Sequence, residues 1–172
     1  MAQQILVLGG RGRIGNSVAE DIAKHTQAEV TVTGRRSLES ENKTSFKYLA
    51  LDLAEIEKLR EAISNSDLVI HSAGPFHYRD STVLQICIEQ GVNYVDVSDH
   101  RSYTSKVLTL HEQAVEKGVT AVISTGIFPG ISNSMVRQCV EQFDEAEKIH
   151  LSYIVAGSGG AGVTVMRTTF LG

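Results

Sequence analysis

A cluster of glycines near the start of the chain has the spacing needed to hold a phosphate-bearing ligand. An apolar run at residues 5–8 leads into Gly10, Gly12 and Gly15, which fit the pattern Gly-x-Gly-x-x-Gly of dinucleotide-binding proteins. We expect Gly10 to take backbone angles closed to other residues. Gly12 would let a pyrophosphate approach the backbone, and Gly15 would let the next helix pack closely.

A helical pattern follows these glycines. Its apolar positions share one face: Ile14, Val18, Ala19, Ile22 and Ala23. The helix start would present free amide groups, including those of Arg13 and Ile14, to phosphate oxygens. A glycine-rich turn in some other α/β fold is the alternative interpretation.

The residues after the second predicted strand indicate which nucleotide is bound. NAD-binding proteins carry a carboxylate there, about 20 residues past the glycines, for the ribose 2′-hydroxyl. This chain has Arg35, Arg36 and Ser37 instead. Guanidinium groups donate paired hydrogen bonds to phosphate, so the sequence predicts NADP, with Arg11 and Arg13 adding charge. Alternatively, these arginines are only solvated surface residues.

Two further loops are candidates for cofactor contact. Asp52 and Leu53 follow the third predicted strand, where Asp52 could accept a hydrogen bond from adenine or cap the next helix. Ala73, Gly74 and Pro75 follow the fourth strand. Open α/β sheets bind ligands beyond the carboxyl ends of their strands, so this loop of small residues is expected to contact the cofactor. An ordinary strand-to-helix turn is the alternative.

Polar residues after the fourth and fifth strands could transfer protons during hydride transfer. They are His77, Tyr78, Asp96, Ser98, Asp99 and His100. We select His77, Asp99 and His100 as the catalytic candidates. Their alternative role is loop and helix capping. No metal-binding motif is present among the six histidines and two cysteines.

Strands and helices alternate along the chain, which predicts an α/β fold. The predicted strands are 5–8, 30–33, 46–51, 68–70, 94–97 and 120–123, and the predicted helices are 13–25, 54–63, 80–90 and 102–117. This order is typical of a Rossmann-type doubly wound parallel sheet. Residues 1–125 would form this dinucleotide-binding domain.

The pattern changes after residue 125. A helix is predicted at 131–143, a strand at 149–155 and a glycine-rich loop at 157–162. These elements have no evident partners, so we expect residues 126–172 to be the truncated beginning of a second domain. A homodimer is one expected assembly.

Composition limits the classes of function. The net charge is −4 with no basic block, which gives no support for nucleic-acid binding. No apolar run is long enough for a membrane span, and the start lacks signal-peptide features. We therefore expect a soluble cytoplasmic protein. Cys87 and Cys139 lie among apolar helical residues and are expected to be buried, reduced thiols.

Several segments together resemble the saccharopine dehydrogenase-like family, specifically its NADP-binding domain. They are residues 9–15 (GGRGRIG), 34–36 (GRR), 72–76 (SAGPF), 87–96 (CIEQGVNYVD) and 129–133 (PGISN). The resemblance covers nearly the whole chain. It implies a Rossmann domain followed by an α+β catalytic and dimerisation domain that carries much of the substrate pocket, of which residues 126–172 would be the incomplete beginning.

The resemblance implies an NAD(P)-dependent oxidoreductase that binds NADP(H) for hydride transfer to a small imine or carbonyl substrate. A different possibility is a non-catalytic NADP(H)-binding module that acts as a sensor or scaffold. A third is a reductase or isomerase of the short-chain type. None of the five tyrosines has lysine four residues later, which argues against that third class.

Overall fold

The structure is a computed structural model that describes residues 2–37, 46–152 and 154. Six strands form one parallel sheet in the order β3-β2-β1-β4-β5-β6. They are β1 (Gln4–Leu8), β2 (Glu29–Gly34), β3 (Lys47–Ala50), β4 (Leu68–His71), β5 (Asn93–Asp96) and β6 (Ala121–Val122). The strand order reverses between β1 and β4. This arrangement confirms the predicted Rossmann-type α/β fold.

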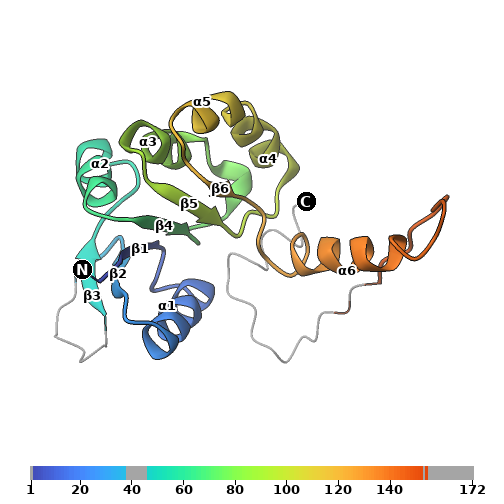
Figure 1. Cartoon of the computed structure of the whole chain (residues 1–172). Coiled ribbons are helices and arrows are strands. Elements are labelled where there is room, and N and C mark those ends of the chain that lie inside the picture. The colour runs from blue at the N-terminus through green and yellow to red at the C-terminus, as the bar shows by residue number, and fades with distance from the viewer. Residues whose placement is uncertain (1, 38–45, 153, 155–172) are drawn as a thin grey trace.

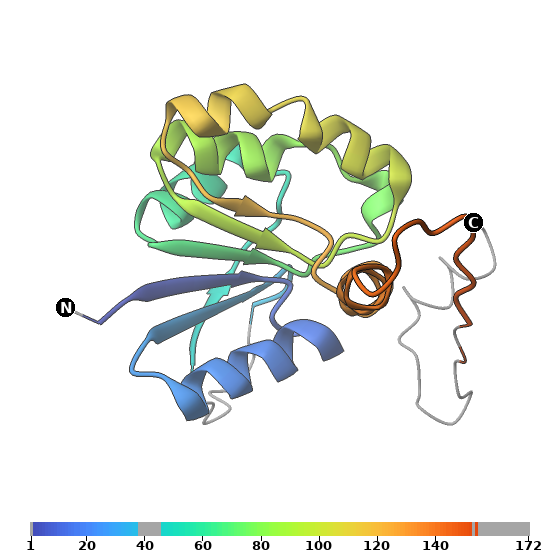
Figure 2. The same ribbon diagram turned by 45° about the vertical axis from the view of Figure 1, so that its right-hand side comes forward.

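Helices cover both faces of the sheet (Figure 1). They are α1 (Arg13–His25), α2 (Ile56–Ser64), the short η1 (Phe76–Tyr78), α3 (Thr82–Gln90), α4 (Arg101–Leu108), α5 (His111–Glu116) and α6 (Ile131–Val140). Figures 1 and 2 both place α1 on one face and α2, α3, α4 and α5 on the other. In both views α6 lies beyond the edge to which the strand arrows point.

Alternating strand residues build a separate hydrophobic core on each face. In β1, Ile5 and Val7 face the α1 side with Ala19, whereas Leu6 and Leu8 face the larger core beneath α2 and α3. Because both faces of β1 are covered, its sequence is continuously apolar rather than alternating. This packing on both faces holds β1 in place, and with it the start of the loop at its carboxyl end.

Two of the predicted elements differ in the structure. The predicted helix 102–117 is two helices, because Thr109 and Leu110 form a turn. The hydroxyl of Thr109 donates to the carbonyl of Lys106 at 2.7 Å, and this local bond competes with the helical pattern. The predicted strand 149–155 is wrong in its described part, where residues 149–152 and 154 are not in a strand. These residues are exposed and add to no sheet, so their backbone has no ladder to join.

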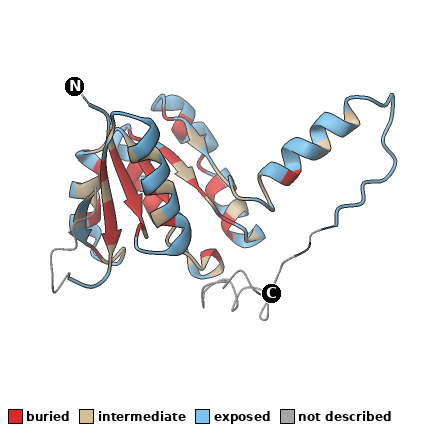
Figure 3. Cartoon of the chain, turned by 90° about the horizontal axis from the view of Figure 1, so that it is seen from below, coloured by how far each residue is buried: buried red, intermediate tan, exposed pale blue. Residues whose placement is uncertain are grey.

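The segment after β6 is largely exposed. Figure 3 shows α6 with little buried surface, and Met135 and Phe143 are 60% and 67% exposed. Cys139 on this helix is exposed, which corrects the prediction of a buried thiol, while Cys87 in α3 is buried as predicted. The glycine-rich loop 157–162 lies outside the described residues. The boundary between domains 1–125 and 126–172 stays a prediction.

Candidate cofactor site

The glycine loop leaves β1 and enters α1 at the carboxyl edge of the sheet. Gly9, not Gly10, takes a left-handed backbone, with φ of +78°, so the expectation for Gly10 was wrong. Gly10 is required for a different reason. A Cβ atom on Gly10 would lie 2.5 Å from Cβ of Val32 on β2. The glycine loop therefore packs directly against Val32 of β2. The spacing of the glycines in the sequence does not indicate this contact.

Gly15 and Gly12 have different surroundings. A Cβ atom on Gly15 would lie 2.5 Å from both the carbonyl oxygen of Gly9 and the hydroxyl of Ser72, so Gly15 permits close packing as predicted. Gly12 is the N-cap of α1 and is exposed, and its Cβ would meet only the carbonyl of Gly9, at 3.1 Å. Its open surface is the approach that a pyrophosphate needs.

The first turn of α1 carries unsatisfied amide groups. Asn16 donates to the carbonyl of Gly12 at 2.8 Å, as the first helical bond. Within the described residues, the backbone amides of Arg13, Ile14 and Gly15 have no acceptor. No acidic residue lies in this turn. The amides and the helix dipole therefore favour an anion here.

The arginines that follow β2 lie at the same edge of the sheet. Arg35, Arg36 and Ser37 are exposed, and no carboxylate follows the strand within residues 34–37. On neighbouring β3, Tyr48 shares its hydroxyl proton between the carbonyls of Gly34, at 3.0 Å, and Arg36. The turn that carries both arginines is therefore tied to the next strand.

Asp52 does not cap α2, which was one of its two predicted roles, because the N-cap is Glu55 and no side chain makes a capping bond there. Asp52 instead closes the turn ahead of that helix. Its Oδ1 atom accepts a hydrogen bond from the amide of Ala54 at 3.0 Å, ahead of α2. Asp52 and Leu53 are both half-buried at the exit of β3. One carboxylate oxygen fixes the local turn, so adenine contact would use the other oxygen.

The loop after β4 contacts the glycine loop. A Cβ atom on Gly9 would lie 2.8 Å from Cα of Ala73, so the two loops touch at the reversal point of the strand order. Arg79, at the end of η1, donates from Nε to the carbonyl of Ala73 at 2.9 Å and from Nη2 to that of Gly74 at 3.5 Å. Arg79 thus holds the segment Ala73, Gly74 and Pro75 in place. Sequence inspection did not identify this contact.

The structure brings two of the three catalytic candidates together. The rings of His77 in η1 and His100 after β5 have centroids 5.5 Å apart. Nδ1 of His100 lies 2.8 Å from the hydroxyl of Ser102, and the His77 ring also contacts Tyr78. Asp99 precedes His100 and is exposed. These residues therefore lie where the loops after β4 and β5 meet.

A buried polar network lies beneath this region. The Tyr94 hydroxyl donates to Oδ2 of Asp96 at 3.0 Å and lies 2.8 Å from the Tyr103 hydroxyl and 3.0 Å from Nδ1 of His71. Because one hydroxyl proton goes to Asp96, Tyr103 and Nδ1 of His71 must donate to Tyr94. Burial, followed by the charge of Arg79, lowers the pKa of His71 to about 3, so this imidazole is neutral.

Asp96 holds loops in place rather than facing ligand. It is fully buried, and its Oδ1 atom accepts from the amides of Ser98 at 2.9 Å and Ser124 at 2.8 Å. Ser98 is also buried, with its hydroxyl 3.1 Å from that of Ser124. These contacts join the loops after β5 and β6. Asp96 and Ser98 thus have the structural role that was the alternative for candidates in this region.

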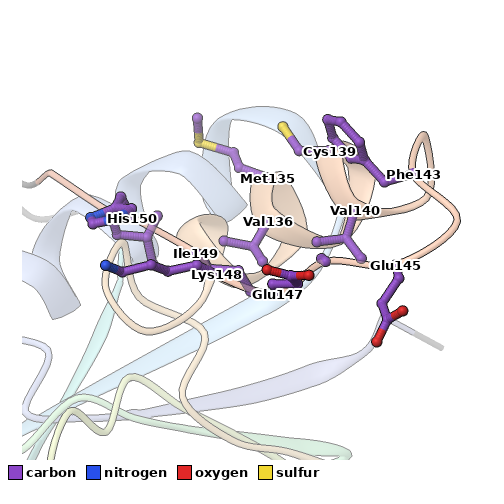
Figure 4. Close-up of a pocket in the computed structure, with 12 residues that line it drawn as sticks. Met135, Val136, Cys139, Val140, Phe143, Glu145, Glu147, Lys148, Ile149 and His150 are labelled. Atoms are coloured by element: carbon purple, nitrogen blue, oxygen red, sulfur yellow. The ribbon is translucent and has the colours of Figure 1, made fainter.

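A cavity of about 420 Å³ lies between α6 and the residues that follow it (Figure 4). One side of α6 and residues 145–151 line it, with apolar side chains that include Met135, Val140 and Phe143. None of the residues predicted to bind the cofactor or to be catalytic lines this cavity.

Within the described residues, no helix is long and apolar enough to cross a bilayer.

Comparison with known proteins connects this geometry to a family. A rat saccharopine dehydrogenase-like oxidoreductase is 24% identical over 193 residues, which covers 97% of this chain and 44% of the rat protein. The human protein of the same name is 30% identical over 94 residues, covering 54% of this chain and 21% of that protein. The chain therefore spans less than half the length of these curated relatives.

A solved structure has the same fold. Apo histidine-tagged saccharopine dehydrogenase (L-Glu forming) from Saccharomyces cerevisiae superposes with a TM-score of 0.71 and 21% identity, over 82% of this chain and 31% of that one. The family model described as the saccharopine dehydrogenase NADP binding domain matches residues 5–122. Apart from Gln4, that range contains the whole sheet, and it contains every residue predicted to bind the cofactor. The family agrees with the NADP predicted from the arginines. Because the match spans more than half of the sequence, the chain belongs to the saccharopine dehydrogenase NADP-binding domain family.

Proposed function

We propose that this chain binds NADP(H) at the carboxyl ends of β1, β2 and β4 and serves as the nucleotide domain of an oxidoreductase. One observation carries the proposal. The open amides of the α1 start and the arginine pair, Arg35 and Arg36, lie at one edge of the sheet, and no carboxylate follows β2 within residues 34–37. Pyrophosphate would bind the α1 start, and the 2′-phosphate would bind the arginines.

The residues fit this cofactor on three counts. Gly12 exposes backbone that no side chain covers, and Arg35 is exposed next to a turn that Tyr48 holds. Ala73, Gly74 and Pro75 lie against the glycine loop, where Arg79 supports them. Bound NADPH supplies a hydride. This chain's own residues hold the nucleotide and shape the edge at which a substrate would meet it.

We propose that His77, Asp99 and His100 face an imine or carbonyl substrate. The His77 and His100 rings lie 5.5 Å apart beside the loop that contains Ala73, close enough for one substrate group to reach both. The exposed apolar face of α6 supports the prediction that residues 126–172 begin a second domain, which would complete the substrate pocket. The homodimer and the cytoplasmic location stay predictions.

The test compares the binding of NADPH and NADH, measured by fluorescence titration and by thermal unfolding. The chain should bind NADPH more tightly, and replacing both Arg35 and Arg36 with alanine should weaken NADPH binding by at least about 10-fold while leaving NADH unchanged. Equal affinity for the two nucleotides in the unmodified chain would contradict the 2′-phosphate argument.

Turnover is tested separately with the longest natural form of the protein. Oxidation of NADPH is followed with small imines and keto acids as substrates. Reduction of one of these compounds would support the enzyme. Tight NADPH binding without turnover of any of them would favour a sensor or scaffold.

A further inference from the structure

Tyr48 on β3 connects the loops after β1 and β2, which flank the proposed 2′-phosphate position. Its hydroxyl bonds to the carbonyls of Gly34 and Arg36 at the end of β2. Its ring lies under the guanidinium of Arg11, which comes from the loop after β1, with Cζ 5.7 Å from the ring centroid. This distance allows a cation–π contact. One side chain on β3 therefore fixes parts of two other loops.

Gly34 makes room for this arrangement. A Cβ atom on Gly34 would lie 2.9 Å from both Cδ of Arg11 and the hydroxyl of Tyr48. Any larger residue at this position would displace one of them. The Arg11 side chain consequently passes directly over the end of β2, beside the turn that continues into Arg35 and Arg36.

Arg11, Arg35 and Arg36 lie on the two loops that Tyr48 contacts. Within the described residues, Arg11, Arg35 and Arg36 form no ion pair with a carboxylate. Gathering like charges at one strand end is unfavourable unless an anion joins them. Arg11 is nevertheless held there, by an aromatic ring that neutralises no charge. A phosphate group is the ligand chemistry that this arrangement suits.

We propose that Tyr48 is a positioning residue for recognition of the 2′-phosphate, and that Arg11 is a direct contributor to it. The Tyr48 hydroxyl sets the turn that carries Arg35 and Arg36, and the ring sets the Arg11 guanidinium beside that turn. This inference rests on the proposed binding of NADP(H). It goes further, because it assigns selectivity to a tyrosine on β3 that need not touch the nucleotide.

The test measures binding of two small probes by isothermal titration calorimetry at one ionic strength. Adenosine 2′,5′-bisphosphate carries the 2′-phosphate, and ADP lacks it. The variants are Tyr48→Phe, which keeps the ring, Tyr48→Leu, which removes ring and hydroxyl, and Arg11→Met. Thermal unfolding of each variant establishes that it is folded.

We expect the preference for adenosine 2′,5′-bisphosphate over ADP to fall about 3-fold in Tyr48→Phe and about 10-fold in Tyr48→Leu and Arg11→Met. ADP binding should stay within about 2-fold of the unmodified chain. Lys47→Met is the control, since it removes one positive charge from the adjacent residue, where Lys47 pairs with Glu29 at 2.5 Å. That variant should keep the full preference.

An unchanged preference in Tyr48→Leu would overturn the inference, and so would equal loss of both probes, which indicates a purely structural role. A loss in Lys47→Met as large as that in Arg11→Met would also overturn it, because general attraction of charge would then suffice. These results leave the proposed function standing if the unmodified chain binds NADPH. Failure of the unmodified chain to bind either NADPH or adenosine 2′,5′-bisphosphate would refute the proposed function itself.

Discussion

Replacing Gly12 and Gly15 separately with alanine tests their two different roles, which are phosphate approach at Gly12 and close packing at Gly15. In Gly15→Ala the new Cβ would lie 2.5 Å from the carbonyl of Gly9 and from the hydroxyl of Ser72, and 2.8 Å from Cα of Gly10. Two of these three neighbours are backbone atoms, so the start of α1 must move. In Gly12→Ala the Cβ would meet only the carbonyl of Gly9, at 3.1 Å.

The expected losses of stability differ accordingly. Overpacking at Gly15 should lower the free energy of unfolding by about 1–3 kcal/mol. The better helix propensity of alanine offsets less than about 1 kcal/mol of this loss. For a chain of this size, the melting temperature should fall by about 3–10 °C. Gly12 has φ of −73°, which alanine adopts freely, so Gly12→Ala should cost only its poorer N-cap preference, about 1 kcal/mol or less.

The two variants should rank in the opposite order for NADPH binding, since Gly12→Ala loses little stability but should lose the most affinity. Gly12→Ala places a methyl group where the pyrophosphate would approach, so NADPH affinity should fall by at least about 10-fold in a protein that melts almost normally. The assays are thermal unfolding by circular dichroism without nucleotide and fluorescence titration with NADPH. The double variant Gly15→Ala with Ser72→Ala removes one of the two shortest contacts and should recover part of the lost stability.

Melting of Gly15→Ala at the same temperature as the unmodified chain or as Gly12→Ala would contradict the close packing at Gly15. Normal NADPH binding by Gly12→Ala would show that phosphate does not bind at the backbone of Gly12. The two outcomes are independent. The first concerns packing between α1 and the loops after β1 and β4, and the second concerns the proposed cofactor.

Two further predictions concern buried groups. Burial lowers the pKa of His71 from 6.5 to about 3, so the unfolded chain binds the proton more readily; stability is complete above about pH 6.5 and decreases as the pH falls toward 3. Urea unfolding of the unmodified chain should show a loss of about 2 kcal/mol between pH 7.5 and pH 5 that is absent in His71→Gln, and equal pH dependence in both would contradict the burial of this imidazole. Thiol labelling of the folded chain should modify Cys139, which is exposed, and spare Cys87, which is buried and whose pKa burial raises to about 12. Labelling of both cysteines at similar rates, or of Cys87 first, would show that α3 is not packed as described.

Local patterns in the sequence predicted most of the nucleotide domain because they depend on residues close together in the chain. The short apolar run before Gly10 is typical of a covered strand, and a helical spacing of apolar residues begins at Ile14. The predictions failed where a distant or missing partner decides the structure. Residues 149–152 are exposed and pair with no strand, and exposed Cys139 has no packing partner in the core.

The sequence by itself determined the class of ligand and the fold. The glycine spacing, the arginine pair and the lack of a carboxylate within residues 34–37 are read from the sequence without coordinates. Only the tertiary structure decided which glycine takes the left-handed backbone, that His71 is buried and neutral, and that the Arg11 guanidinium lies over the Tyr48 ring. Each of these depends on contacts between strands or loops that are far apart in the chain, and residue spacing carries no information about such contacts.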